Sequence, residues 1–177
     1  MSRTSGRTPV VPNGKGCDVE AAGMNRRPLV AAGVLLGIGL GGFVDGIVFH
    51  QLLQTHNMLS ARLPKTSIAN LEVNMFWDGL FHAFTWVMTS VGLALLWRAV
   101  RRRDVPLSTP TLVGSMAAGW GIFNLVEGVI DHQILGIHHV VEGGNPLPWD
   151  LAFLASGIVL IGVGWVVARR GDRGVPR

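Results

Sequence analysis

Two stretches of the chain carry a carboxylate and two histidines with the same spacing. In each stretch a histidine follows the carboxylate after five residues, and a second histidine follows after six more. The first stretch provides Asp45, His50 and His56, and the second provides Glu127, His132 and His138, at an offset of 82 residues. Imidazole and carboxylate groups bind metal ions and transfer protons. The repetition in an otherwise apolar chain therefore predicts a site that uses one of these chemistries.

A second repeated signature follows each stretch. The dipeptide Trp-Asp recurs at residues 77–78 and 149–150, an offset of 72. The match is incomplete, because His82 in the first copy corresponds to Leu154 in the second. Only one copy therefore supplies a further histidine. Asp150 falls in the first turn of a predicted helix, where a carboxylate stabilises the positive end of the helix dipole, and we assign it a structural role.

We predict a metal site at one end of a helical bundle, with its ligands drawn from several helices. The core candidates are His50, His82, His132, Asp45, Asp78, Glu127 and Asp131. Nearer to water, the outer-rim candidates are His56, His138 and His139. Cys17 is the only cysteine, so the ligands are nitrogen and oxygen, which suits Cu, Fe, Zn or Mn. A haem held by His50 and His132 is an alternative.

Regular helix geometry restricts how these residues meet. At about 100° per residue, His50 points about 140° away from Asp45, so the two would serve different neighbouring helices. Asp45 and His56 share a face, but about 16 Å separates them along a regular helix, which is too far to bind one ion. Two polar stripes are predicted, one at Asn74, Asp78, His82, Thr85 and Thr89, and one at Glu127, Asp131 and His138.

The elements that position these residues are four apolar runs, at residues 29–53, 76–100, 112–137 and 151–168. Each approaches or exceeds the roughly 20 residues that cross a bilayer as a helix. Only 15% of the residues are charged, against about 25% in soluble domains. The sequence therefore predicts an all-α integral membrane protein, a bundle of four transmembrane helices. The second helix is predicted to begin near Asn74, as its N-cap.

The distribution of charge predicts the orientation in the membrane. The net charge is +4, but Lys and Arg concentrate near both termini and in the link at residues 98–103. This is the positive-inside pattern, so both termini are predicted in the cytoplasm and the loops 54–75 and 138–148 outside. We expect a multi-pass protein of the bacterial cytoplasmic (inner) membrane. The basic clusters are then explained by orientation and anionic lipid, and we predict no nucleic-acid partner.

The predicted organisation is a membrane domain, residues 28–170, between two cytoplasmic tails. The tail 1–27 is predicted to be disordered, with Met24 as an alternative start to Met1, and residues 171–177 form the second tail. Within the domain, repeats 28–100 and 107–170 would be related by a pseudo-two-fold axis along the membrane normal. The glycine spacing at residues 33, 37 and 41 predicts close packing against another helix of the bundle.

Three strings carry a resemblance to a known family: GFVDGIVFHQ (42–51), WDGLFHAFTW (77–86) and NLVEGVIDH (124–132). They resemble bacterial four-span membrane proteins grouped as domain of unknown function 2243, over about residues 29–168. The resemblance implies the four-span topology and supports the choice of residues, but it implies no particular activity. Its members are often encoded near a membrane protein that assists copper assembly of cytochrome oxidase. The implied partners are a respiratory oxidase or its copper-assembly proteins.

Three functions remain open from the sequence. The first is a membrane metal-binding protein for metal handling or oxidase assembly. The second is a metallo-oxidoreductase, with one or two Fe or Cu ions or haem, acting on O₂, a quinone or a lipid-soluble substrate. The third is a metal-free proton-linked transporter or interaction subunit. The inner halves of the spans contain no Asp, Glu or His, which argues against a proton path through the whole membrane.

Overall fold

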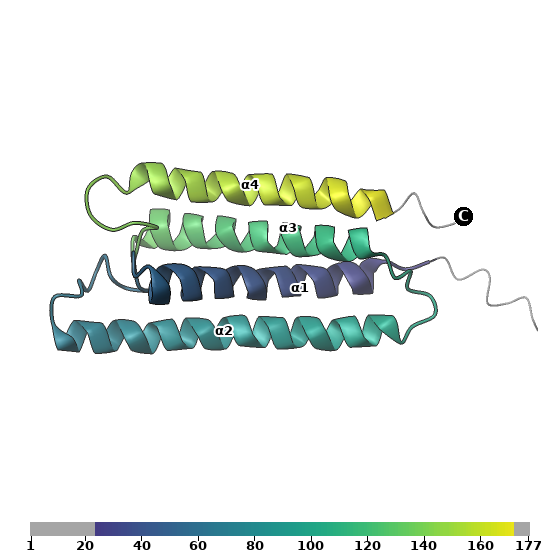
Figure 1. Ribbon diagram of the computed structural model, residues 1–177, viewed down its shortest axis with the longest axis horizontal. Coiled ribbons are helices and arrows are strands. Elements are labelled where there is room, and N and C mark those ends of the chain that lie inside the picture. Colours follow the sequence, from purple (N-terminus) through teal and green to yellow (C-terminus); the bar gives the residue numbers. More distant parts are fainter. Residues whose placement is uncertain (1–23, 172–177) are drawn as a thin grey trace, which may run out of the picture.

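The structure, a computed structural model, describes residues 24–171 as an assembly of helices (Figure 1). The segments are α1 (Arg27–Val44), η1 (Asp45–Leu52), α2 (Ile68–Val100), α3 (Thr109–Glu127), η2 (Gly128–Leu135) and α4 (Leu147–Arg170). The segments η1 and η2 are π-helices that continue α1 and α3. Four continuous helices are long and apolar enough to cross a membrane, as predicted. The predictions for the N-terminal tail, including Cys17 and most of residues 1–27, and for residues 172–177 lie outside the described residues.

Helix α2 is longer than the apolar run predicted. It begins at Ile68, and the hydroxyl of Ser67 caps it by accepting a hydrogen bond from the Asn70 backbone N–H at 3.2 Å. The predicted N-cap, Asn74, instead lies inside the helix and is buried. The error arises because residues 68–75 alternate apolar with polar side chains and so extend the helix beyond its most hydrophobic part.

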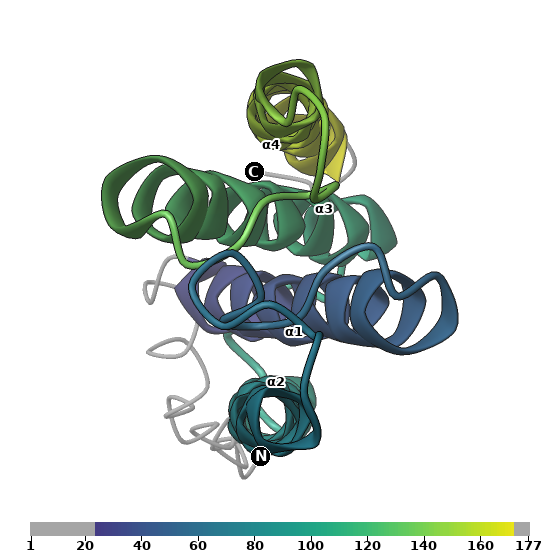
Figure 2. The same ribbon diagram turned by 90° about the vertical axis from the view of Figure 1, so that its left-hand side faces the viewer.

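The four helices lie in a row, in the order α2, α1, α3, α4 (Figures 1 and 2). Helices α1 and α3 pack against each other at the centre, whereas α2 packs only on α1, and α4 only on α3. Half of the most apolar window in the α1–η1 span is buried by protein, against 11% in α2 or α4. The outer helices therefore present most of their apolar side chains to the lipid.

Glycine permits the close approach of α1 and α3. A Cβ atom added at Gly37 would lie 2.0 Å from the backbone oxygen of Met116, and one added at Gly119 would lie 2.1 Å from that of Val34. Any larger residue at either position would push the two helices apart. The predicted small-residue face of α1 thus packs within the chain, on α3.

Both π-helices end at the same end of the molecule, which we call the site end (left in Figure 1). The loops 53–67 and 136–146 lie there and bond to each other. The Ala61 N–H donates to the Ile137 carbonyl at 3.1 Å, and the Glu142 N–H donates to the Thr55 carbonyl at 3.4 Å. The two loops therefore form one connected layer over the ends of α1 and α3.

Candidate metal centre

The π-helical turns bring each carboxylate to the histidine five residues later. In a π-helix the backbone bonds run from residue i to i+5, so residues five apart lie one above the other. The His50 Nε2 atom lies 3.1 Å from an Asp45 carboxylate oxygen. The expectation that these side chains point about 140° apart was wrong, because it assumed α-helical geometry at that turn. Glu127 and His132 have the same spacing across the start of η2.

A reversal of the chain after each π-helix returns the next histidine to the site. Gly136 ends η2 with a φ of 55°, and Gln54 has a φ of 53° after η1, both in the left-handed region. His56 Nε2 therefore lies 3.9 Å from Asp45, where a continued helix would have carried it away. The expectation that His56 and His138 lie near water was also wrong, since they are 1% and 0% exposed.

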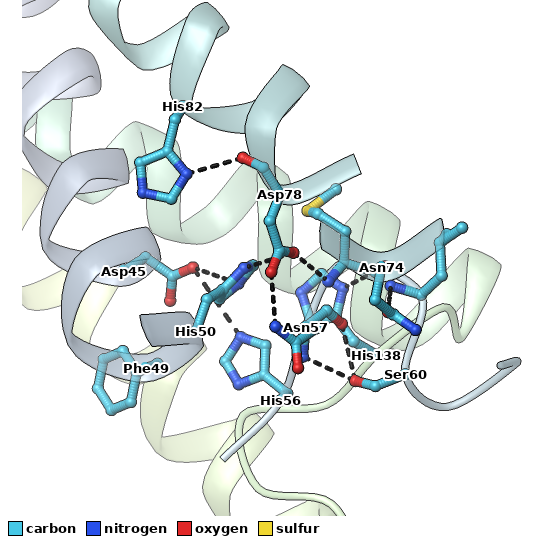
Figure 3. Close-up of polar contacts among 12 residues, drawn as sticks. Asp45, Phe49, His50, His56, Asn57, Ser60, Asn74, Asp78, His82 and His138 are labelled. Carbon is cyan, nitrogen blue, oxygen red and sulfur yellow. Dashed lines mark hydrogen bonds and ion pairs between the residues drawn. The ribbon is translucent and has the colours of Figure 1, made fainter. Parts of the chain in front are cut away.

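Six side chains converge in a buried cluster between the ends of α1 and α3, which we call the His–acid cluster. Its members are Asp45, His50, His56, Glu127, His132 and His138. They form three overlapping trios, and within each trio the possible ligand atoms lie within 4.8 Å of one another. Figure 3 shows Asp45, His50, His56 and His138 facing this centre.

Two outer aspartates hold the histidines of the π-helices from behind. The His50 Nδ1 atom is hydrogen-bonded to Asp78 on α2 at 3.0 Å, whereas the His132 Nδ1 atom lies 3.3 Å from Asp150 on α4 without forming a hydrogen bond. A carboxylate behind the second ring nitrogen orients a metal-binding histidine and raises its basicity. The Nε2 atoms of both histidines are buried without a hydrogen-bond partner in the described part of the chain.

Backbone carbonyls of the opposite loops hold the two loop histidines. His56 Nδ1 lies 2.9 Å from the carbonyl oxygen of Val140, and His138 Nδ1 lies 3.1 Å from that of Met58. Because a carbonyl only accepts, each Nδ1 must carry the proton and donate it. In the neutral rings each Nε2 is then an unprotonated acceptor that faces the centre. Both Nε2 atoms are buried without a hydrogen-bond partner among residues 24–171.

The aspartates and the loops are joined in a crossed arrangement. The Met58 N–H donates to Asp78 at 2.9 Å, and the Val140 N–H donates to Asp150 at 3.1 Å. The Asn57 amide also donates to Asp78, at 2.5 Å (Figure 3). Each aspartate therefore supports one histidine directly and, through the loop backbone, a histidine from the other stretch.

Burial keeps the two loop histidines neutral. Removal from water lowers the pKa of His56 to about 3, an effect that Asp45 opposes and the neighbouring His138 reinforces. Burial likewise lowers the pKa of His138 from its ordinary value. Both residues lie beyond the ends of the membrane-spanning helices. At neutral pH their Nε2 atoms are therefore available as metal ligands.

The structure places four predicted candidates outside the cluster. Asp78 lies behind His50 rather than in a ligand trio. His82 bonds to the backbone oxygen of Asp78, one turn back on α2, at 2.7 Å (Figure 3). His139 bonds to Asp150 at 2.7 Å and joins none of the trios. Asp131 is half-buried on η2 and also belongs to none, because the helix ends at Leu135 and the predicted stripe with His138 does not form.

Sequence reasoning missed three groups that orient the histidines. Asp150 was assigned only to the helix dipole, yet it contacts His132 and His139 and accepts from Val140. Its match with Asp78 in the repeated Trp-Asp signature is the signal that could have identified it. The carbonyls of Met58 and Val140 left no signal in the sequence, because any residue supplies a carbonyl.

An apolar pocket of about 340 Å³ lies beside the cluster, on the side of α1 between α2 and α3. It is lined by Ile38, Phe81, Phe84, Ile122, Phe123, Val126, Glu127 and Asp131. Phe84 and Val126 are exposed, so the pocket opens sideways from the bundle, and we call it the lateral pocket. Glu127 therefore belongs both to the His–acid cluster and to a pocket that faces the membrane.

Comparison with known proteins gives a family but no close relative. Neither the comparison with curated proteins nor that with solved structures gave a match. A family match covers residues 32–171, which include every member of the His–acid cluster and all four spans except the first turn of α1. The resemblance of the three strings is thereby confirmed. The chain belongs to the family described as predicted membrane protein (DUF2243).

Proposed function

We propose that this membrane protein binds a transition metal in the His–acid cluster. One observation carries the proposal: unprotonated imidazole nitrogens face buried carboxylates with no donor between them. His138 Nε2 lies 3.4 Å from Glu127, and neither carboxylate oxygen of Glu127 has a hydrogen-bond partner in the described chain. When the carboxylate is ionised, acceptors opposed in this way repel each other and lose their hydration, at a cost of several kcal/mol. A cation bound between them removes that cost.

The donor set indicates which metals fit. Four imidazoles and two carboxylates suit Cu(II), Fe, Zn or Mn, as the sequence predicted. Six ligands in overlapping trios can complete one six-coordinate ion or be shared by two ions. The histidine rings lie 4.5–6.4 Å apart, and this spacing supports bare ions over haem, whose macrocycle needs a wide flat cavity.

Burial of the centre supports retention of the ion rather than rapid delivery. His50, His132 and Glu127 are all less than 5% exposed beneath the joined loops 53–67 and 136–146. A hydrogen bond between Ser60 and Glu142 also links the two loops. Transfer of metal to a respiratory oxidase or its copper-assembly proteins would require these loops to open. We therefore favour a resident centre, used or stored within this protein.

The proposed orientation is the one that the charge pattern predicts. The site end would face the outside of the bacterial cytoplasmic membrane, and the basic link at residues 101–108 would face the cytoplasm. The crossed hydrogen bonds and the order α2, α1, α3, α4 support a tandem repeat about an axis between α1 and α3. This relation would place the metal centre on the axis.

Elemental analysis of the purified protein tests the proposal. We expect at least one equivalent of Cu, Fe, Zn or Mn per chain, lost in His50→Ala and in His132→Ala. His82→Ala is the matched control, because His82 bonds within its own helix and belongs to no trio. A wild-type protein that retains no metal after loading with each ion would refute the proposal, as would equal retention in all three variants.

One observation favours oxidoreductase activity as a second candidate. The lateral pocket places Glu127 where a lipid-soluble molecule would meet the cluster without leaving the membrane. Catalytic centres keep such an open approach, whereas purely structural centres are closed on all sides. Turnover that depends on both the loaded metal and a lipid-soluble substrate would support this function. A metal that never changes oxidation state under any such substrate would count against it.

A further inference from the structure

The lateral pocket has the form of a small-molecule site rather than a gap between helices. Its volume of about 340 Å³ lies within the range of ligand pockets, roughly 300–1,000 Å³. Six of its eight lining residues are apolar, and the two polar ones are both carboxylates, Glu127 and Asp131. Small-molecule sites have this composition, with a few polar groups that fix the orientation of an otherwise apolar ligand.

The polar and apolar parts of the pocket lie at different depths. Glu127 and Asp131 are near the site end of their span, whereas Ile122 lies one to two turns deeper. Ile38 precedes Asp45 by seven residues, about 10 Å of helix, and also lies toward the middle of the span. A bound molecule would therefore hold its head toward the site end and its tail toward the centre of the membrane.

The carboxylate that can meet a ligand in the pocket is that of Asp131. The oxygens of Glu127 are buried and face the His–acid cluster, so they are not exposed to a ligand in the pocket. Asp131 is half-buried, and no group in residues 24–171 donates to its side chain. A head group with only acceptors, such as a quinone or an ester, would be repelled. A hydroxyl head can donate to an ionised carboxylate in a charge-assisted bond.

The aromatic lining narrows the head group further. Three of the eight lining residues are phenylalanines, and Phe81 and Phe123 lie with ring centroids 6.0 Å apart. Aromatic rings at such separations pack favourably against further rings. We propose that the lateral pocket binds a lipid-soluble hydroquinone, with a hydroxyl group donated to Asp131 and its ring among the phenylalanines.

This inference names the substrate class for the second candidate function and rests on it only through the shared residue Glu127. Binding itself does not require a metal. The two proposals can therefore fail separately: a chain without metal can still bind the hydroquinone, and a metal-loaded chain can leave the pocket without a specific ligand. Each measurement is made on the metal-free and the metal-loaded protein for this reason.

Photo-crosslinking in lipid nanodiscs provides the test. The probe is a decyl-hydroquinone with a photoreactive group on its ring, and mass spectrometry maps the modified peptides. We expect labelling of the α2 segment around Phe81 and Phe84 and of α3–η2 between Ile122 and Asp131. Unlabelled decyl-hydroquinone should compete at least about tenfold better than decyl-quinone, because one charge-assisted hydrogen bond contributes roughly 1.4 kcal/mol or more.

Three variants distinguish specific binding from dissolution in lipid. Val126→Trp fills the pocket and should abolish the labelling, whereas Ile130→Trp adds the same bulk to an exposed position outside the pocket and should leave it unchanged. Asp131→Asn should reduce the preference for hydroquinone over quinone by about tenfold. Equal labelling of the two tryptophan variants would overturn the proposal. Equal competition by quinone and hydroquinone, or a preference unaltered in Asp131→Asn, would also overturn it.

Discussion

Asp78 supports two of the proposed metal ligands without belonging to a ligand trio. It contacts His50 Nδ1 at 3.0 Å directly, and it holds the Met58 N–H at 2.9 Å. The carbonyl of Met58 in turn accepts from His138. Replacing Asp78 with asparagine should therefore weaken metal binding while leaving all six ligands present.

The expected magnitude follows from this geometry. Loss of one group behind a metal ligand typically reduces metal affinity about 10- to 100-fold, or about 1.4–2.7 kcal/mol. The asparagine side chain of the Asp78→Asn variant retains an oxygen that can accept from His50, but it carries no charge. Because two histidines depend on the one carboxylate, we expect a loss near the upper limit. Asp150→Asn should act similarly through His132 and Val140, though less strongly, since its contact to His132 is longer, at 3.3 Å.

The assay is competition with a chelator of known affinity, on protein in detergent, with metal content measured at each chelator concentration. Asp104→Asn is the matched control. Asp104 pairs with Arg102 at 2.6 Å in the link 101–108, at the opposite end of the molecule, and its loss should not alter metal affinity. In the double variant of Asp78 and Asp150 the two losses should multiply, because the aspartates support different histidines.

Two results would refute the reasoning. An affinity of Asp78→Asn within about threefold of wild type would mean that the carboxylate does not orient a ligand. Complete loss of the metal in Asp78→Asn, with Asp150→Asn unaffected, would instead make Asp78 a direct ligand. The sequence alone predicted that role, and the ligand trios do not include it.

Three further outcomes are expected. The metal should be lost in His132→Ala but stay at the wild-type level in His82→Ala, as measured by elemental analysis. Gly119→Val should lower the melting temperature by the equivalent of about 1–3 kcal/mol and release the metal, because the valine side chain would meet the α1 backbone. Gly162→Val should do neither, because no atom lies within 4 Å of a Cβ atom added there. The melting temperature of the metal-free protein should fall as the pH is lowered below 6.5. Below that pH the unfolded chain binds protons at His56 and His138, whereas the folded chain keeps both rings neutral. For His56 this loss of stability continues down to about pH 3, where the folded chain also binds the proton. Each of these histidines contributes up to about 1.4 kcal/mol per pH unit, and a melting temperature independent of pH would contradict the burial of neutral rings.

Much of the fold could be predicted from the sequence because the membrane imposes a simple rule on length and polarity. The four spans and the packing glycines of α1 follow from that rule. The relation of Asp45 to His50 did not, because a π-helical turn has no signal in a pattern read at 3.6 residues per turn. His56 and His138 were placed wrongly for a second reason. Their positions depend on a chain reversal after the helix and on contacts between loops 84 and 80 residues apart in the sequence.

Asp150 illustrates a different limit. An aspartate in the first turn of a helix can stabilise the helix dipole or can support a histidine. The residues around Asp150 in the sequence fit both roles equally well and so could not separate them. The repeat could have done so, because Asp78 and Asp150 occupy matched places. Assigning to Asp150 the role expected of Asp78 would have predicted its contact with a histidine.

The crossed hydrogen bonds have a consequence for each helical hairpin taken alone. Neither helical hairpin contains a complete set of supported ligands, since His56 relies on Val140 and His138 relies on Met58. Two identical hairpins, facing each other through their glycine surfaces, would nevertheless supply every group to one another. A pair of such hairpins would therefore be self-complementary, and the centre exists only where the two hairpins meet.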